Sequence, residues 1–87
     1  MSENLRCTIF VDRDDSGWIV LHTFVGDSST EFLTDDNSQS HSDFKSAIKD
    51  GRKRFKEIKE SDSVSELILK VWRVRQSEFE EIKILKK

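Results

Sequence analysis

Cysteine and histidine are the residue types in this sequence that can build an activated nucleophile. The chain contains one cysteine, Cys7, and two histidines, His22 and His41. A thiol becomes nucleophilic when a neighbouring base takes its proton, which makes Cys7 and His22 the pair to consider. The strand register derived below places these two residues on opposite faces of a hairpin. We therefore expect a buried Cys7, a His22 packed among aromatic rings, and a His41 that belongs to a loop.

Acidic residues occur in one spacing that is typical of metal binding. Asp12, Asp14 and Ser16, followed by Gly17, match the first half of a calcium loop, in which alternate positions supply oxygen ligands. The match ends there, because Thr23 stands where the loop needs a bidentate glutamate and the flanking segments have the pattern of strands. The other acids are not spaced for general acid and base catalysis, and the sequence has no glycine-rich phosphate loop. The sequence predicts a non-enzymatic protein without a metal or cofactor.

Basic side chains recur at helical spacing in the second half of the chain, along one edge of a predicted helix. Such a row can follow a phosphate backbone, and two arginines of a later strand can extend it beside Trp72, which is available for stacking. A solvated helix flank is the simpler interpretation of the same pattern. Nucleic-acid binding is therefore the alternative function, and its candidate residues are Lys45, Lys49, Arg52, Lys53, Lys56, Arg73 and Arg75.

Length and charge limit the classes of protein to which the chain can belong. Its 87 residues are enough for a single domain, 1–87, with a core that is marginal on its own. Residues 1–44 contain 2 basic and 9 acidic side chains, a charge of −7. Residues 45–87 contain 13 basic and 8 acidic side chains, a charge of +5, and the two halves add to the net charge of −2. A globally basic nucleic-acid binder is not indicated. The unpaired cysteine, the absence of a long apolar run and the polar N-terminus favour a cytoplasmic protein that does not enter a membrane.

Residues 40–59 have the pattern of an amphipathic helix. Ser40 and Asp43 have the spacing of a capping box, and Lys56 and Lys59 suit the negative end of the helix dipole. Apolar or small side chains repeat with the helical period, which predicts one buried stripe. The stripe consists of Phe44, Ala47, Ile48, Gly51, Phe55 and Ile58.

Two segments before the helix alternate apolar and polar residues and are rich in β-branched side chains, which predicts strands over residues 4–12 and 18–25. Residues 14–17 between them have the composition of a three-residue hairpin loop with Gly17 in the left-handed position. This loop places Asp14 opposite Trp18. The face that we expect the helix to cover then contains Cys7, Ile9, Val11, Leu21, Thr23 and Val25.

The remaining segments predict further strands. Residues 30–34 are expected to form a short third strand, followed by a loop over residues 35–39. Residues 66–75 are apolar on both faces, which is typical of a central strand. Two interpretations stay open for residues 77–87. Ser77 and Glu80 favour the start of a helix, whereas the alternation around Ile82 and Ile84 favours a closing strand, which we prefer.

These elements predict an α+β domain in which a small antiparallel sheet packs against one helix, in the order ββ(β)αβ followed by a strand or a helix. A parallel pairing of the first strand with a later one is also compatible with the pattern. The second sheet face is aromatic and needs a cover, which a protein partner or a second copy of the chain can supply. The acidic first half can add a negative surface of the kind that inhibitors present to basic sites. The predicted function is non-enzymatic protein binding or self-association through Phe10, Trp18, Val20, His22, Phe24 and Trp72.

Overall fold

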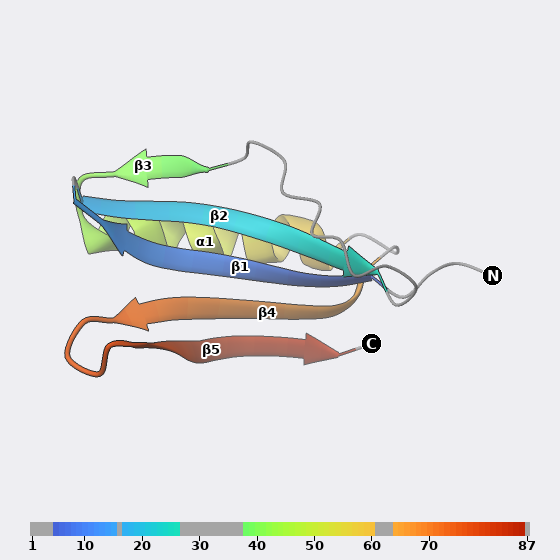
Figure 1. The fold of residues 1–87 in the computed structure, drawn as a ribbon. Coiled ribbons are helices and arrows are strands. Elements are labelled where there is room, and N and C mark those ends of the chain that lie inside the picture. Colours follow the sequence, from blue (N-terminus) through green and yellow to red (C-terminus); the bar gives the residue numbers. More distant parts are fainter. Residues whose placement is uncertain (1–4, 16, 27–37, 61–63, 87) are drawn as a thin grey trace.

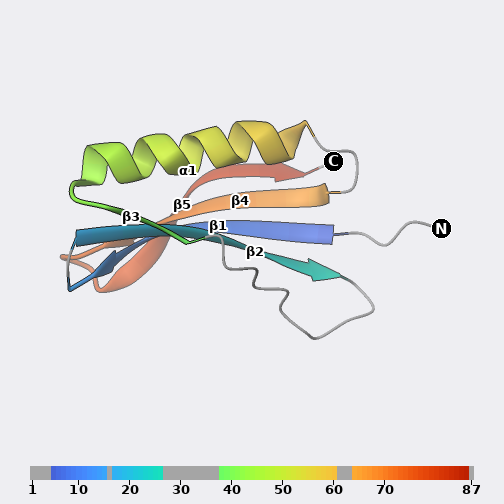
Figure 2. The same ribbon diagram turned by 90° about the horizontal axis from the view of Figure 1, so that it is seen from above.

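A five-stranded sheet with one helix across it makes up the fold in the computed structural model, which describes residues 5–15, 17–26, 38–60 and 64–86. The helix lies on one side of the sheet, and no described element lies on the other side (Figure 1, Figure 2). The described helix is neither long nor apolar enough to cross a membrane. The elements in chain order are β1 (Leu5–Asp14), β2 (Gly17–Gly26), β3 (Gln39–His41), α1 (Phe44–Lys59), β4 (Val64–Arg73) and β5 (Glu78–Lys86).

The strand order in the sheet is β3-β2-β1-β4-β5, with β1 at its centre (Figure 1). β1 pairs antiparallel with β2 and parallel with β4, while β2–β3 and β4–β5 are antiparallel. The predicted α+β class is confirmed, and the parallel β1–β4 pair makes the sheet mixed. A parallel neighbour requires a crossover connection, and α1 provides it by running over the sheet between β3 and β4.

The hairpin register differs by one residue from the predicted one. Asp14 pairs with Gly17 rather than with Trp18, so the chain reverses over two residues instead of three. Because side chains alternate along a strand, a one-residue shift moves every β2 side chain to the other face. The physical reason is burial beneath the helix: Trp18 packs against Phe44 at the start of α1, with ring centroids 4.9 Å apart, and Val20 is fully buried.

The core lies between α1 and the sheet. The helix contributes Ala47, Gly51 and Phe55, which are buried as the stripe predicts, whereas Phe44 at its first turn is partly exposed. The expected capping box is wrong in one respect. Asp43, not Ser40, is the N-cap, and its carboxylate accepts a hydrogen bond from the backbone N–H of Ser46 at 2.7 Å. The sheet contributes Cys7, Ile9, Val11, Trp18, Val20, Val64, Leu67, Leu69 and Val71.

The C-terminal segment is a strand, as preferred from the sequence. β5 pairs with β4 along its length, for example Ile84 with Ile68 and Phe79 with Trp72. The helical alternative is therefore wrong. The predicted third strand, residues 30–34, lies outside the described residues. The short strand β3 instead occupies residues 39–41, where a loop and the helix start were expected, and it pairs with the start of β2.

Candidate functional site

The sheet face opposite the helix, here called the open face, is the first candidate surface. The residues of the open face follow from the alternation of side chains along each strand. Ile9, Val11, Leu67 and Leu69 point into the core, so the residues before and after each of them in the strand point away from the helix. No described element covers this side (Figure 2). The registers align its apolar members across the four long strands, and they are Phe10, Ile19, Leu21, Val25, Ile68, Trp72, Phe79 and Ile84.

Three aromatic rings from three strands meet on the open face. The ring of Phe79 lies 5.3 Å from that of Phe10 and 5.1 Å from that of Trp72, with interplanar angles of 71° in both pairs. Edge-to-face contacts at such distances are favourable for aromatic pairs. The three rings thus form one ordered apolar cluster on β1, β4 and β5. Phe79 was absent from the predicted interface, although its pairing position opposite Trp72 follows from a β4–β5 hairpin.

Charged side chains of both signs also lie on the open face. The registers place three cations and four anions among the apolar residues, which gives this face a net charge of −1. Arg6, Glu66 and Lys86 stand side by side in one row, and Lys70 pairs with Glu81 in another. The seven charged residues are Arg6, Lys70, Lys86, Asp12, Asp14, Glu66 and Glu81.

Four of the six predicted interface residues lie on the helix side because of the register shift. Trp18 and Val20 are buried there, His22 contacts Arg54 of α1, and Phe24 pairs with Cys7. The prediction that these four residues lie on the uncovered sheet face was wrong. The two that do lie on the open face are Phe10 and Trp72.

The second candidate surface is the outward side of α1, here called the basic helix face. Its cations are all exposed, and none makes an ion pair with another described residue. The two arginines of the later strand that were expected to extend this row are placed as follows: Arg73 pairs with Glu80 of β5, and Arg75 lies in the β4–β5 turn. The basic helix face consists of Lys45, Lys49, Arg52, Lys53, Lys56 and Lys59.

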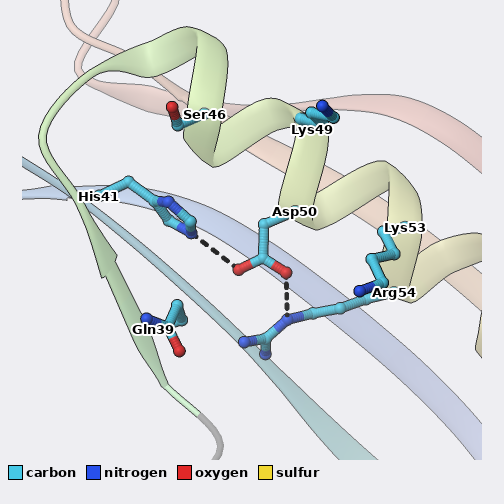
Figure 3. A pocket seen from close by; sticks show the side chains of 7 residues that line it. All are labelled: Gln39, His41, Ser46, Lys49, Asp50, Lys53 and Arg54. Atoms are coloured by element: carbon cyan, nitrogen blue, oxygen red, sulfur yellow. Dashed lines mark hydrogen bonds and ion pairs between the residues drawn. The ribbon is translucent and has the colours of Figure 1, made fainter.

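A cleft of about 480 Å³ lies between β3 and the flank of α1, next to the basic helix face (Figure 3). At its centre Asp50 is held from two sides. Nε2 of His41 lies 2.9 Å from Oδ2, and Nε of Arg54 donates to Oδ1 at 3.1 Å. The seven residues that line this β3–α1 cleft are Gln39, His41, Ser46, Lys49, Asp50, Lys53 and Arg54.

The environment of Asp50 favours its charged form. Burial acts to raise the pKa of this carboxyl, but the hydrogen bonds from His41 and Arg54 outweigh it, so the pKa lies below its ordinary value. Arg54 also donates from Nη1 to Nδ1 of His22 at 3.1 Å, since a guanidinium has no acceptor. Sequence reasoning missed this network. The four-residue spacing of Asp50 and Arg54 suggests their pair, but no local signal brings His41 to them.

Cys7 and His22 lie on the same sheet face, in contrast to the prediction, because the register is shifted. The geometry nevertheless opposes an activated thiolate. Cys7 is 1% exposed, and burial raises the pKa of its thiol to about 12. His22 is engaged by Arg54 and lies edge-on to Phe24 at 5.4 Å. The expected buried Cys7 is confirmed.

Comparison of the chain with protein-family models, with curated proteins and with solved structures finds no match. The open face, the basic helix face and the β3–α1 cleft are the described features that bear on function.

Proposed function

We propose that this protein is a non-enzymatic interaction protein that associates with a second copy of itself through the open face. The observation that carries the proposal is the cluster of Phe10, Trp72 and Phe79 on a sheet face that no described element covers. Aromatic residues that pack together within an apolar patch are typical of the residues on which binding energy concentrates. An apolar patch of this kind is otherwise costly to leave in water.

The charges of the open face favour a second copy over a strongly charged partner. A two-fold dimer brings the same patch together twice, so its charges must complement themselves. The presence of three cations beside four anions allows this, because Arg6 or Lys70 of one copy can meet Glu66 or Glu81 of the other. A face of a single sign would instead repel its own copy.

The size of the open face also suits a dimer. Four strands at a spacing of about 4.8 Å, each nine or ten residues long with a rise of about 3.3 Å, span roughly 600 Å² in projection. Accessible area exceeds the projected area because side chains stand out from the sheet. A standard interface buries about 800 Å² per partner, so the open face is large enough for a stable association.

Two matched substitutions test this proposal. Ile84 lies on the open face and is 53% exposed, while Val74 lies in the β4–β5 turn and is 56% exposed. Ile84→Asp and Val74→Asp therefore add the same charge at equally accessible apolar positions. Light scattering coupled to size exclusion should find a wild-type dimer that persists in high salt. We expect Ile84→Asp to weaken it about tenfold or more and Val74→Asp to leave it unchanged.

Either of two results overturns self-association through this face. The first is a wild-type monomer at every concentration measured. The second is a dimer that both aspartate variants weaken equally. Circular dichroism of each variant separates loss of association from loss of folding.

Nucleic-acid binding is the second candidate function, and the basic helix face favours it. Its six cations are exposed and lack anionic partners among the described residues. A phosphate backbone could therefore pair with them without displacing an existing ion pair. The double change Lys49→Glu and Arg52→Glu should abolish binding of a single-stranded oligonucleotide and spare the dimer. Wild-type affinity that does not fall with salt would contradict this function.

We also propose that the protein works in the cytoplasm, where a single thiol stays reduced. The burial of Cys7 supports a structural role for this residue.

A further inference from the structure

The β3–α1 cleft is open to solvent and combines room for a small molecule with an excess of positive charge. Lys49, Lys53 and Arg54 carry three positive charges and Asp50 one negative charge, so the cleft has a charge of +2 with His41 neutral. Its volume of about 480 Å³ lies within the range of about 300 to 1,000 Å³ that is typical of small-molecule sites.

Asp50 does not oppose an incoming anion as strongly as its charge suggests. Each of its oxygens already holds a partner, with His41 on one and Arg54 on the other, and its side chain is 18% exposed. The carboxylate thus acts as an internal counter-ion that fixes the positions of Arg54 and His41. Figure 3 shows both side chains directed at Asp50 from opposite sides.

Lys49 and Lys53 lie one helical turn apart at the rim of the cleft. Both are exposed, and neither makes an ion pair with a described residue. Two ammonium groups at this spacing can bind one phosphate together, because residues four apart on a helix are neighbours. Ser46 and Gln39 add polar groups on two sides of the same space.

We propose that the β3–α1 cleft binds the phosphate group of a nucleotide, which enters either free or as one residue of a nucleic-acid strand. The two lysines take the phosphate, and the remaining volume accommodates the sugar and base beside Gln39 and His41. This inference deepens the second candidate function, nucleic-acid binding. It rests on that function only where the phosphate belongs to a nucleic-acid strand. It is independent of association through the open face.

The experiment uses the full chain with adenosine monophosphate, adenosine and a single-stranded oligonucleotide as probes. Titrations followed by calorimetry and by the proton NMR signals of the His41 ring should detect saturable binding of adenosine monophosphate and none of adenosine. The variant Lys49→Gln/Lys53→Gln should weaken mononucleotide binding about tenfold or more, as expected for the loss of charge-assisted hydrogen bonds.

The variant Arg52→Gln/Lys56→Gln is the matched control. It removes two charges at the same four-residue spacing from the same helix, but neither residue lines the cleft. Mononucleotide affinity should fall clearly less than in the cleft variant, because Arg52 and Lys56 can act on the bound phosphate only through their charge, which salt screens, and not through direct hydrogen bonds. A nucleic-acid strand is the ligand if the oligonucleotide binds more tightly than the mononucleotide and both double variants weaken oligonucleotide binding. Equal affinities identify the free nucleotide.

Three results overturn the cleft proposal. Adenosine monophosphate does not bind, adenosine binds equally well, or both double variants weaken the mononucleotide to the same extent. If the mononucleotide does not bind while oligonucleotide affinity falls equally in both variants, the basic helix face remains a nucleic-acid surface without a cleft site. The failure of this inference is thus distinct from the failure of the second candidate function.

Discussion

Gly51 permits close contact between the helix and the sheet, and its replacement by alanine tests that contact. A methyl carbon added at Gly51 would lie 2.8 Å from Cγ2 of Val11 and 3.2 Å from Cδ1 of Leu69. Both neighbours are fully buried, and the β-branched Val11 side chain has little rotamer freedom. The helix or the strand must therefore move to admit the methyl group.

Two opposing effects set the magnitude. Overpacking a close-packed core costs about 1 to 3 kcal/mol, whereas replacing glycine by alanine within a helix gains about 1 kcal/mol. We expect Gly51→Ala to lower the free energy of unfolding by about 1 kcal/mol, measured by urea denaturation followed by circular dichroism. In a Val11→Ala background the space becomes available, and the same change should stabilise by about 1 kcal/mol.

The sign of the stability change caused by Gly51→Ala alone shows whether α1 approaches β1 as closely as described. If Gly51→Ala stabilises the wild-type protein, as it would at an exposed helix position, the close approach of α1 to β1 is refuted. A double-mutant cycle that gives no coupling between positions 51 and 11 would refute it as well, since contacting residues are not additive.

The remaining predictions concern two titratable groups. Asp50→Asn should lower the free energy of unfolding by about 1.5 kcal/mol at neutral pH, as is typical of lost charge-assisted hydrogen bonds. Because the folded-state pKa of Asp50 is depressed, its contribution is present above the unfolded-state pKa and is lost as the pH falls through the folded value. Wild-type and variant stabilities should therefore begin to converge as the pH falls below about 4, and a difference that stays constant with pH would contradict this. Cys7, with a thiol pKa of about 12, should resist iodoacetamide until urea unfolds the protein. Fast alkylation of the folded chain, rising with pH near neutrality, would instead indicate an activated thiol.

Local periodicity was sufficient to predict the fold class, the helix and the long strands, but not the short strand β3. The helical stripe predicts the burial of Ala47, Gly51 and Phe55, and two-residue alternation predicts the strands. Such patterns succeed because each residue of a regular element meets the core at an interval that the backbone geometry sets. The exposed cations of the basic helix face follow from the same rule.

Tertiary structure decided which residues share a face and which elements are neighbours. A hairpin loop of two or three residues is acceptable locally at residues 14–17, but only the shorter one places Trp18 against Phe44 and Val20 in the core. The network of His41, Asp50 and Arg54 likewise joins β3 to α1. Contacts between distant segments select among locally equivalent registers, and a shift of one residue exchanges the two faces of a strand. The sequence alone therefore determined the helix and the long strands, and packing determined β3, the open face and the cleft.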